Sequence, residues 1–272
     1  MAMKNRIDHL FANKNENILS IFLTAGYPQL IDTPKIIKIL NSTQVDLIEV
    51  GIPFSDPLAD GPIIQESSMA ALENGMTLQL IFEQLQTLRT YTQLPILLMG
   101  YLNSVMRFGE EKFYKACHEI GIDGVILPDM PLAEYEKIHQ PLSEKYNVKV
   151  VHIITPETSV ERIHKIDANS SGFLYLVSSN STTGNYKAEA FSLKDSLKTI
   201  KSLTLKNPLL IGFGIKGHTE FKEACQYAKG AIIGSSFVKL IGTSKDFEKD
   251  IPEFISNIKN ISDNATSSEV EK

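Results

Sequence analysis

The chain has 272 residues, of which 43% are hydrophobic and 22% charged, a balance typical of a folded globular protein rather than a disordered one. Its net charge of −5 argues against broad contact with nucleic acid or an anionic membrane surface. The longest apolar stretches, such as residues 94–99 and 209–213, fall far short of the roughly 20 residues that a membrane-spanning helix needs. Charged residues at positions 4, 6 and 8 interrupt the N-terminal segment, so we expect no secretory signal and a cytoplasmic protein.

Cysteine and histidine are sparse. Cys117 and Cys225 lack a neighbouring cysteine or histidine pair, and the six histidines are scattered without the spacing of metal ligands. We therefore expect neither a disulfide framework nor a metal site, and no cofactor.

The chain alternates short apolar runs rich in β-forming residues with longer amphipathic segments. It begins with a predicted helix, Arg6–Asn13. Eight predicted strands then follow in order: residues 18–24, 45–50, 95–99, 124–127, 149–154, 173–177, 209–213 and 231–233. Between them, apolar residues three and four apart, such as Ile36, Ile37 and Leu40, predict outer helices. This alternation is typical of repeated βα units and a parallel sheet.

Eight βα units in about 250 residues match an α/β protein of the (β/α)8 (TIM) barrel type better than a doubly wound open sheet. No linker interrupts the series, so we predict one domain over residues 1–261. The polar residues 262–272 are expected to form a disordered tail. The extra helix before the first strand is expected to cover the bottom of the barrel.

The second predicted strand carries a carboxylate, Glu49, near the end of an apolar run. Burial there disfavours the charged form and raises the pKa of Glu49, which suits a proton donor. The alternative is that Glu49 pairs with a buried base or a backbone donor. The loop that follows holds three prolines and two aspartates, Asp56 and Asp60. Both aspartates suit turns, but Asp60 also lies where it can face the same cavity as Glu49.

Residues 49–62 read Glu-Val-Gly-Ile-Pro-Phe-Ser-Asp-Pro-Leu-Ala-Asp-Gly-Pro, and this run resembles the signature of the tryptophan synthase alpha chain family. The resemblance extends from about residue 10 to residue 238. It implies a (β/α)8 barrel that cleaves indole-3-glycerol phosphate to indole and glyceraldehyde 3-phosphate by a retro-aldol step. It also implies a beta chain as partner, with two alpha and two beta chains in the complex.

The resemblance also implies roles for individual residues. Glu49 would be the acid and base, Asp60 would hydrogen-bond the indole N–H, and Tyr175 on the sixth strand would line the substrate site. Period-two alternation alone leaves Tyr175 open as a core residue with a satisfied hydroxyl. An apolar slot for indole would be formed by Phe22, Ile64 and Phe213, for which core packing is the alternative.

Glycine-containing loops after the seventh and eighth strands predict a phosphate site, because barrels of this kind bind phosphate there. By resemblance, the phosphate-binding positions are Gly184, Gly214, Gly234 and Ser235. The polar loop 178–184 has the composition of a lid, and Thr183 matches the closing loop of the family. Just before it, residues 179–181 read Ser-Asn-Ser where many relatives carry Arg-Ser-Gly. Asp56 is expected to couple the lid to the partner.

The loop around Pro53 and Asp56 and the segment 101–103 would contact the beta chain, again by resemblance. Two other functions stay open from the residues alone. The glycine loops also suit an isomerase or aldolase of sugar phosphates. The altered segment 179–181 also suits a silent subunit, one without catalytic activity that only activates its partner. The presence of Glu49, Asp60 and Tyr175 argues against this function.

Overall fold

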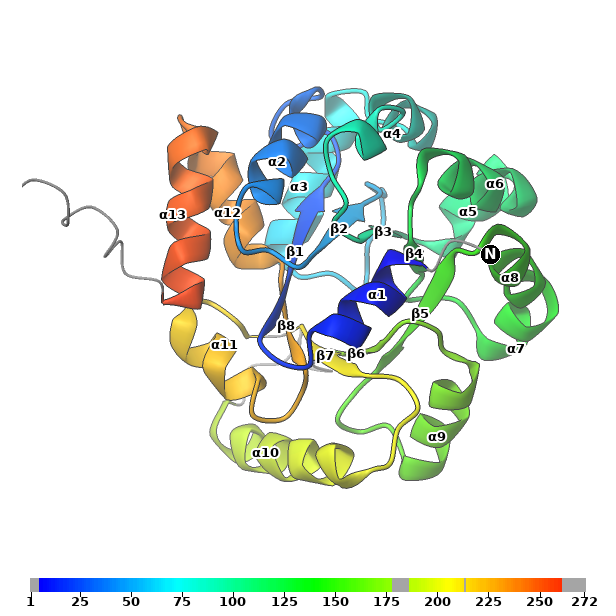
Figure 1. Cartoon of the computed structure of the whole chain (residues 1–272), viewed down its shortest axis with the longest axis vertical. Coiled ribbons are helices and arrows are strands. Elements are labelled where there is room, and N and C mark those ends of the chain that lie inside the picture. Colours follow the sequence, from blue (N-terminus) through cyan, green and yellow to red (C-terminus); the bar gives the residue numbers. More distant parts are fainter. Residues whose placement is uncertain (1–4, 178–185, 213, 261–272) are drawn as a thin grey trace, which may run out of the picture.

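The computed structural model describes residues 5–177, 186–212 and 214–260, and for residues 186–193 only the backbone of a helix. Eight parallel strands pair in chain order and close into a barrel, because β1 pairs with both β2 and β8. The (β/α)8 barrel expected from the sequence is confirmed (Figure 1). The strands are β1 (Ile18–Thr24), β2 (Leu47–Gly51), β3 (Ile96–Met99), β4 (Gly124–Ile126), β5 (Lys149–Ile154), β6 (Leu174–Leu176), β7 (Leu209–Ile211) and β8 (Gly230–Ile233).

The strands are apolar because both of their faces are covered. On β1, Leu19, Ile21 and Leu23 belong to the large cluster that also holds the helix side chains. Ile18 instead belongs to a second cluster with at least one residue from every strand, which fills the barrel interior. Alternate residues of each strand thus face the helices or the interior, and this alternation decides which side chains can reach a site inside the barrel.

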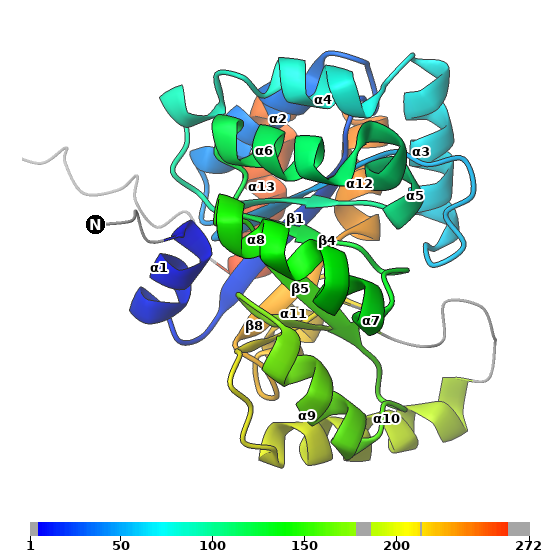
Figure 2. The ribbon, with the colours of Figure 1, turned by 90° about the vertical axis from the view of Figure 1, so that its right-hand side faces the viewer.

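Helices form a ring around the strands (Figures 1 and 2). They are α2 (Asp32–Asn41), α3 (Pro62–Glu73), α4 (Leu78–Gln84), α5 (Leu102–Phe108), α6 (Glu110–Ile120), α7 (Leu132–Glu134), α8 (Gln140–Tyr146), α9 (Val160–Asn169), α10 (Tyr186–Ser202), α11 (His218–Ala224), α12 (Ser235–Thr243) and α13 (Phe247–Lys259). A short 3-10 helix, Leu88–Thr90, and a π-helical turn, Tyr135–His139, complete the set for the described residues. None of the helices in this part of the chain is long and apolar enough to cross a membrane.

The first helix, α1 (Arg6–Asn13), lies across one end of the barrel (Figure 1). Ile7 is fully buried in the interior cluster. Asn5 caps α1 and also donates from Nδ2 to the backbone oxygens of Asp123 (2.8 Å) and Asn147 (3.0 Å). Because these residues lie one and two positions before β4 and β5, α1 closes the N-terminal end of the barrel. The predicted position of this helix is confirmed.

Several strands are shorter than predicted. β2 begins at Leu47 because the side chain of Asp46, rather than a backbone oxygen, accepts the hydrogen bond from the backbone N–H of Leu19 (2.9 Å). The same carboxylate forms an ion pair with Lys14 (2.6 Å). β6 ends at Leu176, although the N–H of Val177 still donates to Ile154 O (3.0 Å). Isolated backbone hydrogen bonds of this kind continue the pairing of neighbouring strands past the strand ends, before the loops diverge. The predicted tail at 262–272 lies outside the described residues.

Candidate active site

Glu49 is the third residue of β2, where the pairing register places it opposite Phe22 of β1 and Leu97 of β3. Its side chain is fully buried. The Ser20 hydroxyl donates to Glu49 Oε1 at 2.8 Å, whereas Oε2 has no hydrogen-bond partner among the described residues. Burial raises the pKa of Glu49 to about 8, and the Ser20 hydrogen bond partly opposes this rise. The carboxyl is therefore largely protonated at neutral pH, as its position in the sequence predicts.

Asp60 lies on the loop between β2 and α3, half-buried beside the ring of Tyr101. The Tyr101 hydroxyl donates to Asp60 Oδ2 (3.1 Å) and accepts from the N–H of Ala59 (3.1 Å). The Tyr101 ring also stacks on Phe54, with ring centroids 4.9 Å apart. Burial raises the pKa of Asp60, and the hydrogen bond from Tyr101 opposes it. Tyr101, which lies after β3, thus contacts the loop that carries Asp60 both near its start, at Phe54, and near its end, at Ala59 and Asp60.

Tyr175 lies on β6 and is buried within the barrel interior cluster. Burial, and then the charges of Glu49 and Asp60, raise the pKa of its hydroxyl well above the usual value. A Cβ atom at Gly212, just after β7, would overlap the ring and hydroxyl of Tyr175. Glycine at this position therefore leaves the space in which the Tyr175 hydroxyl lies, within electrostatic reach of both carboxyls.

A narrow, largely apolar pocket opens at the C-terminal ends of β2, β3 and β4. Phe22 and Ile64, both expected to hold an indole ring, line it and also pack together in one small cluster. The remaining lining residues are Gly51, Ile52, Asp60, Ser68, Met99, Gly100, Tyr101 and Pro128. The pocket has a volume of only about 20 Å³. The chemistry of its lining, apolar with one half-buried carboxyl on the wall, matches an aromatic group that carries a single N–H donor, but an indole ring requires the pocket to widen.

Three of the four predicted phosphate positions, Gly214, Gly234 and Ser235, lie after the ends of β7 and β8. Ser235 is the first residue of α12, and Gly234 is its N-cap. Gly214 has a φ of +68°, a left-handed conformation that glycine adopts readily. The Ser236 hydroxyl donates to Ile215 O at 3.2 Å, which ties the loop after β7 to the start of α12. A helix N-terminus next to two glycine loops offers backbone N–H groups to an anion. Gly184, Thr183 and Phe213 lie outside the described residues.

A family model described as tryptophan synthase alpha chain matches residues 9–266. The chain belongs to the tryptophan synthase alpha chain family. The tryptophan synthase alpha chain of Bacteroides thetaiotaomicron is 48% identical over 91% of this chain and 96% of its own length. That of Bacteroides fragilis is 46% identical over 96% of this chain and 98% of its own. The solved tryptophan synthase subunit alpha of Legionella pneumophila superposes with a TM-score of 0.83 at 29% identity, covering 94% of this chain and 97% of that one.

Membership of this family makes the chain a carbon–carbon lyase that cleaves indole-3-glycerol phosphate, in the biosynthesis of tryptophan. It also implies a tryptophan synthase beta chain as partner. The chemistry of the pocket described above is consistent with such a substrate, since its lining combines apolar side chains with the carboxyl of Asp60. The alternative of an isomerase or aldolase of sugar phosphates is not supported.

Tyr101 is a site residue that the sequence analysis assigned to partner contact alone. It lines the pocket at the strand ends of this tryptophan synthase alpha chain family member, hydrogen-bonds Asp60 and stacks on Phe54. Its position could have indicated this, because it lies two residues after the third strand and strand C-terminal ends form the active face of a barrel. Ser20 was also missed, since a single serine within an apolar strand has no motif around it.

Asp56 is exposed on the same loop as Asp60 and accepts a hydrogen bond from the Ser55 hydroxyl at 2.6 Å. The loop is anchored by the Gln65 amide, which donates to the backbone oxygens of Pro57 (3.3 Å) and Asp60 (2.9 Å). Leu58, at the loop tip, is 85% exposed. The loop is therefore fixed at its base, while its tip, with Asp56, faces away from the barrel interior.

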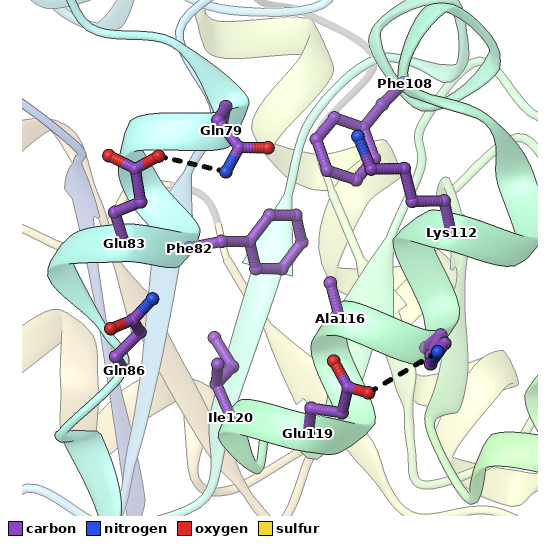
Figure 3. Close-up of a pocket in the computed structure, with 10 residues that line it drawn as sticks. Gln79, Phe82, Glu83, Gln86, Phe108, Lys112, Ala116, Glu119 and Ile120 are labelled. Atoms are coloured by element: carbon purple, nitrogen blue, oxygen red, sulfur yellow. Dashed lines mark hydrogen bonds and ion pairs between the residues drawn. The ribbon is translucent and has the colours of Figure 1, made fainter.

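A larger groove lies on the flank of the barrel, between α4 and α6 (Figure 3). Its floor is formed by Phe82 and Phe108, with ring centroids 5.3 Å apart, and its rim carries polar side chains such as Gln79, Glu83 and Glu119. All of its lining residues come from outer helices or their ends. Strand ends do not reach it, so the pocket at the C-terminal ends of the strands is the better candidate for the active site.

Proposed function

We propose that this chain cleaves indole-3-glycerol phosphate in the pocket at the C-terminal ends of β2 to β4, with Glu49 as acid and base and Asp60 as stabiliser of the indole ring. The observation that carries this proposal is the environment of Glu49. Its carboxyl is fully buried, has a pKa of about 8, and keeps Oε2 free of protein partners among the described residues. A neutral carboxyl at neutral pH is what a general acid requires.

The reaction begins with a proton transfer from Glu49 to the indole carbon that bears the glycerol phosphate. The ring then becomes an iminium-like cation, and Asp60 accepts a hydrogen bond from its N–H and stabilises the positive charge. The carboxylate of Glu49 next takes the proton of the adjacent glycerol hydroxyl. The carbon–carbon bond breaks, its electron pair returns to the ring, and indole and glyceraldehyde 3-phosphate are formed with Glu49 protonated again.

Binding groups surround these carboxyls. Phe22 and Ile64 are proposed to hold the indole ring, joined by Phe213, and Tyr175 to position the substrate beside Glu49 and Asp60. The apolar walls exclude water and so strengthen the electrostatic interactions of both carboxyls. The phosphate is proposed to bind Gly214, Gly234, Ser235 and Gly184, where the N-terminus of α12 favours an anion.

We propose that the loop that carries Asp56 mediates regulation of the lyase activity by the beta chain. This loop and the segment 101–103 would contact the beta chain, and Asp56 together with Thr183 would couple closure of the lid to that contact. The complex would contain two alpha and two beta chains, as the family suggests. A cytoplasmic location is supported by the family, which is cytoplasmic in general.

The proposed function is tested by the release of indole from indole-3-glycerol phosphate by the purified chain, with and without a tryptophan synthase beta chain. We expect indole in both cases, and more of it when the beta chain is present. A folded chain that binds the beta chain but releases no indole under either condition would overturn the proposal. It would favour the silent subunit instead.

A further inference from the structure

Ser20 is a polar residue in the apolar interior of the barrel. It lies on β1 between Ile18 and Phe22, the neighbouring residues on the inward face, and is fully buried. Barrel interiors are normally filled by bulky apolar side chains, and a buried hydroxyl is unfavourable unless it finds a hydrogen-bond partner. The partner of Ser20 is the carboxyl of Glu49, whose Oε1 accepts from Ser20 Oγ at 2.8 Å.

The contact joins two neighbouring strands. The register of β1 and β2 places Ser20 opposite Leu47 and Phe22 opposite Glu49. The Ser20 and Glu49 side chains both face the interior, so the hydrogen bond runs diagonally from one strand to the other. Both groups stand on regular strands rather than on loops, which fixes the carboxyl more rigidly than a loop contact would.

We propose that Ser20 is a positioning residue for the lyase reaction: its hydroxyl occupies Oε1 of Glu49 and leaves Oε2 as the oxygen that exchanges the proton with substrate. This inference rests on the proposed role of Glu49. While the carboxyl is neutral, the proton lies on Oε2 and the carbonyl oxygen Oε1 accepts from Ser20. After the proton has moved to the indole carbon, Ser20 still donates to the carboxylate, and Oε2 is free to take the proton of the glycerol hydroxyl.

The same hydrogen bond adjusts the acidity of Glu49. Burial raises the pKa of this carboxyl, and the Ser20 donor lowers it because it favours the charged form. Within the described part of the chain, Tyr175 on β6 and Asp60 on the loop after β2 belong to the same electrostatic group, because the pKa of Tyr175 is raised first by burial and then by the charges of both Glu49 and Asp60. Ser20 thereby keeps Glu49 able both to give and to accept a proton near neutral pH, which a residue with two successive roles requires.

The test compares Ser20→Ala, which removes the donor, with Ser20→Thr, which retains a hydroxyl. The matched control is Ser143→Ala on α8, where another buried serine hydroxyl donates to a backbone oxygen, Val148 O, at 2.7 Å. Indole release is measured for the full chain with the beta chain present, as kcat and KM across pH. The pKa of Glu49 is measured separately in each variant by NMR of carbon-13-labelled glutamate side chains, with Glu49→Gln assigning the signal.

We expect Ser20→Ala to lower kcat by about tenfold with KM nearly unchanged, and to raise the pKa of Glu49 by about one unit. Ser20→Thr is expected to restore most of both, and Ser143→Ala to change neither. An unaltered pKa and kcat in Ser20→Ala, while Glu49→Gln abolishes turnover, would overturn this inference and leave the proposed function standing. A rise in kcat in Ser20→Ala would also overturn it, because the hydrogen bond from Ser20 would then be slowing the proton transfer by Glu49. If Glu49→Gln itself turned over normally, the proposed function would fail instead.

Discussion

At the scale of single residues, Glu49 shows how a site is built at the expense of stability. A charged carboxylate inside an apolar barrel is unfavourable, so the group stays protonated until the pH approaches 8. In the unfolded chain the pKa of this carboxyl is near 4.5. The folded chain therefore retains a proton over a pH range in which the unfolded chain releases it. The contribution of Glu49 to stability is complete below pH 4.5 and is lost progressively as the pH rises to about 8.

Glu49→Gln is expected to remove this pH dependence, because the amide cannot ionise. The difference in unfolding free energy between the variant and the wild type should move in favour of the variant by a few kcal/mol, on the order of 5 at most, as the pH rises from about 4.5 to about 8. Urea unfolding at both ends of this range measures it. A constant difference would show that the folded carboxyl ionises at its ordinary pKa.

How far the site could be predicted from sequence also differs by residue. Glu49 could be predicted because a carboxylate near the C-terminal end of an apolar strand is a local pattern. Its contact with Ser20 could not, because it depends on the register between β1 and β2, which the closed barrel sets. Tyr101 likewise contacts Asp60 across 41 positions of sequence. Contacts of this kind depend on the whole fold and leave no local signal.

At the scale of elements, the predicted helix and strands were found where apolar periodicity placed them, and the errors lie at their ends. The apolar residues from Leu78 to Leu88 keep a helical spacing of three and four, but α4 ends at Gln84 and a 3-10 turn begins at Leu88. This break still buries Leu85 and Leu88 completely. A hydrophobic pattern reports which residues are buried, and it does so whether or not the helix continues between them.

The first helix offers a test at this scale. Asn5→Ala removes the cap of α1 and the two hydrogen bonds to backbone oxygens before β4 and β5, so we expect a loss of about 1 to 3 kcal/mol in unfolding free energy. KM and kcat should change little, because α1 closes the end of the barrel opposite the active face.

The matched control for that change is Asn13→Ala, on the exposed side of the same helix, where the amide donates only to His9 O among the described residues (2.7 Å). We expect it to change the unfolding free energy by no more than about 0.5 kcal/mol. If both variants were equally stable in chemical unfolding, α1 would not be clamped to the barrel by Asn5.

At the scale of the whole molecule, the closed barrel brings side chains from β1, β2 and β6 together in its interior. Ser20, Glu49 and Tyr175 are far apart in sequence, yet each stands on an inward-facing strand position. The loop after β2 adds Asp60 from above and carries Asp56 outward at its tip. One loop therefore connects the proposed chemistry to the proposed partner surface.

This connection predicts an unequal effect of Asp56→Ala. We expect the stimulation of indole release by the beta chain to fall about fivefold or more, while substrate binding by the isolated chain stays nearly unchanged. The control, Glu73→Ala, removes the same charge at the far end of α3 and should affect neither quantity. Equal losses in stimulation and in substrate binding by Asp56→Ala would refute the coupling role of this residue.

The most direct test of the account is the turnover of Glu49→Gln measured beside its affinity for indole-3-glycerol phosphate. The amide preserves the size of the side chain and can still accept from Ser20, but it has no acidic proton to transfer. We expect kcat for indole release to fall by at least about 100-fold while the affinity for substrate changes by less than about threefold. Turnover close to that of the wild type would contradict the account, because another group would then supply the proton.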